Sequence, residues 1–217
     1  MNKRFPVLRS MTVVAALAAS VLQAGCISPR SFVDPTIPKV SYEAVRPRPS
    51  PLALKLETEF QRNGQGMPRV TPTLRLDVER VLLKSGLVAP QDHDVPGGTI
   101  RVVVNNLADQ GAAAAKGFGT GLTFGLVGTT VTDRYEMTVT VTRAGRSTQS
   151  TLVRHALHTA IGNTTLPEGI ETMTTGEAFS RVVEQMLLRC LSDLQKSGQL
   201  AARPAPHDGL ALPARAG

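Results

Sequence analysis

The chain has 217 residues, enough for one ordinary domain with extensions. Its formal net charge is +7, yet the basic residues are scattered among acidic ones and no aromatic side chains lie between them to stack on bases. This distribution argues against a nucleic-acid partner and predicts a mildly basic, solvated surface. Because tryptophan is absent and aromatic residues make up 4% of the chain, we expect a core of leucine, valine, alanine and methionine.

Residues 1–25 are typical of an export signal. Basic residues come first, and an apolar run from Met11 to Leu22 follows that is too short for a comfortable membrane span. The segment ends in Ala24-Gly25 and is followed by Cys26. An ordinary signal peptide cut near Ala24, with Cys26 as a stray thiol, is one interpretation.

The end of this segment also resembles the lipobox of bacterial lipoproteins, although Gln23 stands where that family prefers leucine. The resemblance implies that the Cys26 thiol is acylated and that the signal peptide is cut before it. Two or more acyl chains anchor a protein stably to a membrane. Because Ile27 follows the cysteine, where aspartate would mark inner-membrane retention, the resemblance implies a lipid anchor in the outer membrane, facing the periplasm.

Residues 26–51 contain six prolines and no periodic apolar pattern. Proline fixes φ and withholds a hydrogen-bond donor, so we expect an extended tether that ends in the run Arg46 to Pro51. Val40 to Val45 is the one piece that could form an extra edge strand.

The pattern over residues 52–198 predicts one α+β domain. Alternation of period two predicts strands over 52–60, 99–107, 134–142 and 148–161, the last two joined by a turn at 143–146. A helix is expected from Thr71, as N-cap, to Gly86, and residues 90–98 and 163–174 are expected to be loops.

A second helix is predicted over 176–196, because Thr174 and Glu177 have the spacing of a capping box. Its apolar stripe includes Cys190, expected as a small buried side chain. Residues 199–217 are rich in alanine, proline and glycine and are expected to form a disordered tail. The predicted fold is thus a small, mostly antiparallel sheet with two helices packed on one face.

This order of elements resembles the α+β domains of periplasm-facing accessory lipoproteins, including relatives of the curli-secretion lipoprotein. The likeness covers residues 52–197 and implies a role in envelope assembly or transport. It carries no diagnostic motif.

Enzyme motifs are absent from the sequence: there is no G-x-S-x-G, no H-E-x-x-H and no paired-cysteine motif. His155 and His158 fall on opposite faces of a strand, which makes them poor joint metal ligands. Asp92-His93-Asp94 is expected to be a solvated turn. We therefore expect a protein that is not an enzyme and has no metal or cofactor.

The glycine-rich, apolar insert at 110–132 lies between two predicted strands, and its pattern predicts a contact surface. As a helix it would carry a tandem GxxxG, and as a strand it would have one bulky apolar face and one bare face. A further interpretation is a crossover packed on the domain or on a partner. The residues expected to contact a membrane or a partner are Gly117, Phe118, Gly121, Leu122, Phe124, Gly125 and Leu126.

Taken together, the sequence predicts a non-enzymatic outer-membrane lipoprotein that acts through contacts with the membrane, with an envelope protein or with its own copies. Two alternatives stay open. One is a subunit of an oligomeric membrane pore or secretion channel, and the other is a periplasmic ligand-binding domain.

Overall fold

The computed structural model describes residues 29–108, 128–198 and 200. The chain divides into two compact units. The described part of unit 1 comprises residues 29–32, 128–132 and 158–178, and that of unit 2 comprises residues 33–108, 133–157, 179–198 and 200. No helix in the described ranges combines the length and apolar character that a membrane crossing requires.

In unit 2, neighbouring strands of a mixed sheet follow the order β8-β6-β5-β2-β3, and the parts of β6 from Asp133 and of β8 up to Leu157 belong to this unit. These strands are β8 (Val153–Ile161), β6 (Thr129–Arg143), β5 (Thr99–Leu107), β2 (Leu52–Arg62) and β3 (Gln65–Gly66). Two short strands lie off this path: β4 (Val88–Gln91) pairs with β2, and β7 (Arg146–Gln149) pairs with β6.

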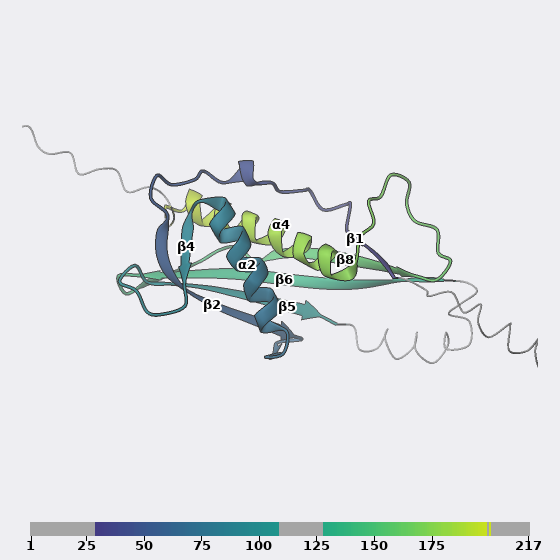
Figure 1. Cartoon of the computed structure of the whole chain (residues 1–217), viewed down its shortest axis with the longest axis horizontal. Coiled ribbons are helices and arrows are strands. Elements are labelled where there is room, and N and C mark those ends of the chain that lie inside the picture. The colour runs from purple at the N-terminus through teal and green to yellow at the C-terminus, as the bar shows by residue number, and fades with distance from the viewer. Residues whose placement is uncertain (1–28, 109–127, 199, 201–217) are drawn as a thin grey trace, which may run out of the picture. The chain divides into compact units, whose positions relative to one another are not determined.

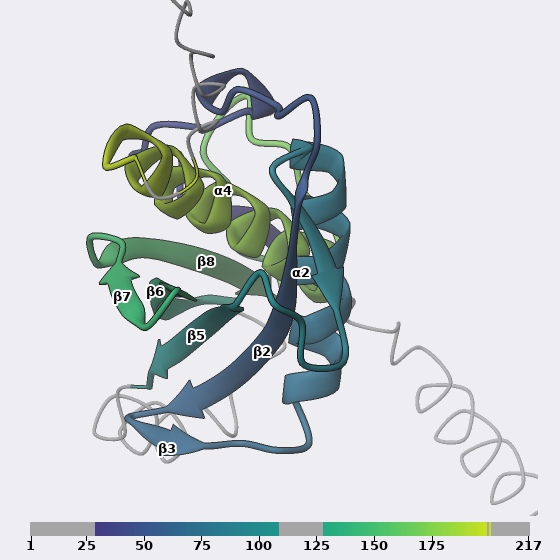
Figure 2. The ribbon, with the colours of Figure 1, turned by 90° about the vertical axis from the view of Figure 1, so that its left-hand side faces the viewer.

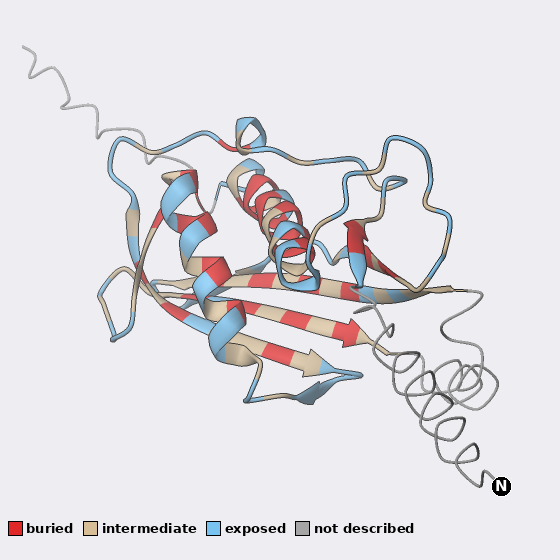
Figure 3. Cartoon of the chain, turned by 45° about the vertical axis from the view of Figure 1, so that its right-hand side comes forward, coloured by how far each residue is buried: buried red, intermediate tan, exposed pale blue. Residues whose placement is uncertain are grey.

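Two helices, α2 (Thr71–Ser85) and α4 (Thr175–Lys196), cover the same face of this sheet (Figures 1 and 2). Their buried sides face the alternate buried positions of the strands (Figure 3). Phe179 of α4 contacts the rings of Phe60 and Tyr135 at centroid distances of 5.9 and 5.5 Å. The large side chains with no exposed surface include Leu54, Leu74, Ile100, Met137 and Leu187.

The predicted α+β class is confirmed, with the two helices on one face, and the sheet is mixed. Strands β5 and β6 pair antiparallel, whereas β2 pairs parallel with both β4 and β5. The parallel pairing follows from the chain order, because α2 carries the chain from β2 back to the start of its neighbour. The predicted loop at 90–98 is wrong at its first two residues, since Pro90 and Gln91 belong to β4.

Helix α2 begins at Thr71, so the prediction that Thr71 is its N-cap is wrong. Val70 occupies the cap position and makes no side-chain hydrogen bond there. The Thr71 hydroxyl instead accepts a bond from the Phe60 amide at 3.3 Å and lies 3.3 Å from the Met67 carbonyl, to which it donates. The predicted stop is confirmed: Gly86 has a left-handed φ of 66° and donates to the Leu83 carbonyl.

Side chains of α2 also occupy the outer edge of β2. Arg75 donates from Nη1 to the Leu56 carbonyl at 2.9 Å, one turn along the helix from Thr71. Sheet edges with free backbone groups invite pairing with other chains. The two α2 side chains therefore satisfy edge groups between the stretches of β2 that pair with β4 and β3.

The predicted return strand at 148–161 is interrupted at Ser150. The Ser150 hydroxyl accepts a bond from the Val139 amide at 3.1 Å, and the Ser150 amide donates to the Val139 carbonyl at 2.8 Å. Strand β7 therefore ends at Gln149, and β8 starts at Val153. The predicted turn at 143–146 is confirmed, with φ values of 49° at Ala144 and 74° at Gly145 that match a type I′ hairpin.

The described part of the predicted tether in unit 2 packs on this unit. A 3-10 turn, η1 (Tyr42–Ala44), replaces the alternative of an edge strand, and Val45 is buried. Arg46 and Gln195 exchange two hydrogen bonds, at 2.9 and 2.7 Å, and Arg48 donates to the Gly86 carbonyl. Prolines prevent regular pairing here, but the chain still packs on the unit through individual hydrogen bonds.

Strand β1 (Arg30–Val33), of which residues 30–32 belong to unit 1, is a neighbour of β8 in the sheet. Ser31 exchanges backbone bonds with Met173, and its hydroxyl lies 2.9 Å from those of Thr159 and Thr175. The predicted capping box of α4 is confirmed, because the Glu177 amide donates to the Thr174 hydroxyl and the Glu177 carboxylate accepts from the Thr174 amide. A strand at 30–33 thus lies inside the segment predicted as a tether.

The C-terminal tail predicted for 199–217 has one described residue. Leu200 is fully buried in unit 2, and its carbonyl accepts a bond from Arg48 at 3.1 Å. The expectation of a tail starting at 199 is therefore wrong at Leu200, and residues 201–217 lie outside the described chain.

A candidate ligand groove along helix α4

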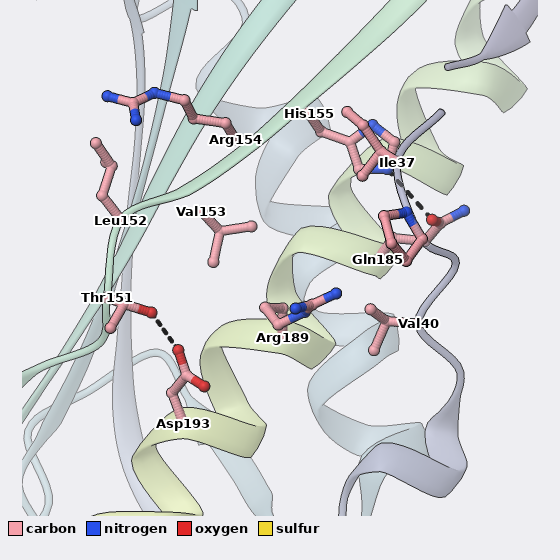
Figure 4. Close-up of a pocket in the computed structure, with 11 residues that line it drawn as sticks. Ile37, Val40, Thr151, Leu152, Val153, Arg154, His155, Gln185, Arg189 and Asp193 are labelled. Carbon is pink, nitrogen blue, oxygen red and sulfur yellow. Dashed lines mark hydrogen bonds between the residues drawn. The ribbon is translucent and has the colours of Figure 1, made fainter. Parts of the chain in front are cut away.

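A groove of about 480 Å³ in unit 2 runs between α4, the chain just before and at the start of β8, and the segment 37–40 (Figure 4). Its lining is mostly apolar on the two flanking segments. The polar groups come from α4 and from the start of β8. The lining consists of Ile37, Pro38, Val40, Thr151, Leu152, Val153, Arg154, His155, Gln185, Arg189 and Asp193.

A buried histidine–glutamine pair forms one side of this groove. His155 and Gln185 have exposed fractions of 4% and 5%, and His155 Nε2 lies 3.2 Å from Gln185 Oε1. The Ala156 amide donates to His155 Nδ1 at 2.9 Å. The Ala156 carbonyl oxygen lies 3.2 Å from the same nitrogen. In the tautomer with its proton on Nε2, the ring accepts the bond from the Ala156 amide and donates to Gln185. The pair fixes which way the Gln185 amide faces.

A second hydrogen bond joins the two sides of the groove at its other end. The Thr151 hydroxyl donates to the Asp193 carboxylate, which links the chain before β8 to α4 (Figure 4). The Asp193 carboxylate is therefore engaged within the protein.

The two arginines of the groove differ in their partners. Arg154 points away from α4, and its Nε donates to the Glu136 carboxylate at 2.9 Å (Figure 4). Arg189 extends from α4 toward Val40, and among the described residues it makes no hydrogen bond or ion pair (Figure 4). Arg189 is thus the charged group of the groove that can receive a ligand without giving up an internal partner.

The polar groups of the groove are few, and most of them are engaged within the protein. Within residues 29–108, 128–198 and 200, no three histidine, cysteine or acidic side chains gather as a metal ion would need. His155 has both ring nitrogens engaged by the protein itself. An apolar surface with a few fixed polar groups is the usual composition of a small-molecule site.

The residues singled out from the sequence are distributed differently. Cys26 and the insert residues Gly117, Phe118, Gly121, Leu122, Phe124, Gly125 and Leu126 lie outside the described chain. His155 enters the groove, whereas His158 stacks on Phe32 in unit 1 at a centroid distance of 5.1 Å. The turn at 92–94 is exposed, with Asp94 paired to Lys55 at 2.9 Å.

Sequence reasoning missed the polar side of the groove. Gln185, Arg189 and Asp193 recur every four residues on α4, so they share one face of the helix. That spacing is visible in the sequence. The sequence gives no sign that residues 37–40 and 151–153 lie opposite this face of α4, because neither segment has a regular pattern.

Comparison with protein-family models and with curated proteins finds no match to this sequence.

Proposed function

We propose that this protein is an outer-membrane lipoprotein, anchored through Cys26, whose periplasm-facing domain works by binding and has no enzymatic activity. The lipobox-like end Ala24-Gly25-Cys26 supports the anchor. The observation that carries the binding role is the groove, in which Arg189 has no partner among the described residues. Such a protein serves as an accessory factor of envelope assembly or transport.

The glycine-rich insert is the second contact surface of this proposal. Its pattern, with Phe118, Leu122 and Phe124 spaced along one face of a strand, supports contact with a partner protein or with the bilayer. Crosslinking and pull-down of the lipidated protein, with and without residues 111–131, tests this role. Loss of specific partners from the shortened protein is expected, and an unchanged set of partners contradicts it.

The groove also favours the alternative of a ligand-binding domain over that of a pore subunit. A pore requires assembly into a closed ring, and light scattering of the detergent-purified protein measures this directly. A monomer is expected if the protein is a binding domain. A stable ring of several copies would instead support the pore.

The localisation has its own test, by separation of inner and outer membranes on a density gradient. We expect the wild-type protein in the outer-membrane fraction and the Cys26→Ser variant absent from it. Cys190→Ser is the matched control, because it removes the other cysteine and leaves the lipobox intact. A Cys26→Ser variant that stayed in the outer-membrane fraction would contradict the anchor.

A further inference from the structure

The groove in unit 2 has two donor groups placed one helical turn apart. Gln185 and Arg189 are four residues apart on α4, so their side chains lie on the same face of the helix. The His155–Gln185 bond occupies the amide oxygen of Gln185. The NH₂ group of Gln185 is therefore the part of that side chain left to donate.

These donors are accessible to a ligand. No buried side-chain nitrogen or oxygen in the described residues lacks a hydrogen-bond partner. The structure shows no bond from the Gln185 NH₂ group within this part of the chain, so that group reaches accessible surface, and it points away from Arg189 (Figure 4). Arg189 is exposed and extends across the groove from the same face of α4.

An anionic head group matches Arg189. A guanidinium fork binds a carboxylate through two parallel hydrogen bonds. Asp193 lies one turn beyond Arg189 and is held by Thr151, so the free approach to Arg189 is on the Gln185 side. Asp193 keeps its negative charge when Thr151 donates to it, so a carboxylate head would approach Arg189 from the side away from Asp193.

The rest of the groove surface favours a ligand whose remaining part is compact and apolar. Ile37 and Val40 line one side of the groove, and Leu152 and Val153 line the other (Figure 4). The volume of about 480 Å³ lies within the range of roughly 300–1,000 Å³ that small-molecule sites occupy. A protein partner would bury a larger and flatter surface, on the order of 800 Å² on each side.

We propose that this groove binds a small amphiphile that has an apolar body and a carboxylate head, with the head on Arg189. This assignment names the ligand class of the groove and rests on the binding role proposed above. The body of the ligand would lie between the segment 37–40 and Val153.

Titration calorimetry with decanoate, below the concentration at which it forms micelles, tests the assignment. The protein is the mature chain from residue 26 with Cys26→Ser, which removes the acyl anchor and with it the need for detergent. Saturable binding of decanoate at one site is expected. Decanol, which lacks the charge, and propionate, which lacks the body, are each expected to bind at least about tenfold more weakly, because each loses one part of the recognition.

Arg189→Gln is expected to weaken decanoate binding by about tenfold or more, since a charge-assisted bond is lost. Arg181→Gln is the matched control: Arg181 is an exposed arginine two turns earlier on α4, outside the groove lining, and its loss should leave affinity unchanged. Circular dichroism verifies that both variants are folded. Equal decanoate affinity in wild type and Arg189→Gln, or no saturable binding, overturns the proposal.

Two further outcomes distinguish a failure of the ligand assignment from a failure of the proposed function. Tighter binding of an acidic, apolar octapeptide than of decanoate overturns the small-molecule assignment and leaves the binding role intact. Failure of the membrane anchor appears only in the gradient experiment with Cys26→Ser, because the calorimetry uses protein without the anchor.

Discussion

At the scale of single residues, the chemistry of several side chains follows from how they are buried in unit 2. Cys190 has no exposed surface, and burial raises the pKa of its thiol to about 12. The thiolate is the reactive form of cysteine, so a buried thiol with a raised pKa is inert. The sequence placed Cys190 correctly on the apolar stripe of a helix, because the period of that stripe is local.

Cys190 should therefore report unfolding. In the Cys26→Ser protein it is the remaining cysteine of the chain, so a thiol reagent such as dithionitrobenzoate reads it alone. At pH 8 we expect little reaction with the folded protein and one equivalent of reaction in denaturant. Rapid stoichiometric labelling under native conditions would show that Cys190 is not in the core.

Tyr42 illustrates a contact that sequence reasoning did not find. Its hydroxyl donates to the Glu184 carboxylate at 3.0 Å, and Arg80 donates to the same oxygen at 3.2 Å. Burial, with added contributions from the hydrogen bond and charge of Glu184, raises the pKa of Tyr42 to about 12. The pairing joins residues more than 100 positions apart, which no local pattern encodes.

The raised pKa gives Tyr42 a definite effect at alkaline pH. The folded protein retains the phenol proton where the unfolded chain, with a pKa of about 10, releases it. The contribution of this group to stability is thus complete below pH 10 and is lost as pH rises toward 12. Urea unfolding of wild type and Tyr42→Phe at several pH values measures this. We expect a smaller alkaline loss in Tyr42→Phe, and parallel losses in the two proteins would count against the contact.

At the scale of elements, strands with a long alternating pattern could be predicted and short ones could not. The pattern of β5 gave the right bounds, since Ile100, Val102 and Val104 alternate over nine residues. Strands β1 and β4 have four residues each, and their neighbours in the sheet define them. The break at Ser150 is likewise set by its bonds to Val139 on the neighbouring strand, which the sequence of the return strand does not show.

Gly98, just before β5, lies very close to the backbone at the end of β6. Its φ of 105° is one that residues with a side chain rarely adopt, and a Cβ there would collide with the Thr142 carbonyl oxygen. We expect Gly98→Ala to lower the free energy of unfolding by on the order of 1–3 kcal/mol. Urea denaturation measures the change.

Gly176→Ala is the matched control, because a Cβ at that position in α4 meets nothing within 4 Å. Alanine favours helix over glycine, so this variant should be unchanged or more stable by under about 1 kcal/mol. Equal stability of Gly98→Ala and Gly176→Ala would contradict the close approach at Gly98.

At the scale of the whole molecule, some candidate functional residues are inferred from sequence pattern and others from the fold. The proposed anchor at Cys26 and the contact residues of the insert come from sequence pattern and lie outside the described chain. The groove comes from the fold alone, because it needs α4, β8 and residues 37–40 together. The four-residue spacing of Gln185, Arg189 and Asp193 was visible in advance, but its meaning depended on which segments lie opposite.

The central claim is that Cys26 carries the lipid that holds this binding domain at the outer membrane. Metabolic labelling with a clickable palmitate analogue tests it most directly, in cells that express wild type, Cys26→Ser or Cys190→Ser. The account predicts strong labelling of wild type and Cys190→Ser and none of Cys26→Ser. A Cys26→Ser protein that is labelled and bound to the membrane as well as wild type would contradict the account.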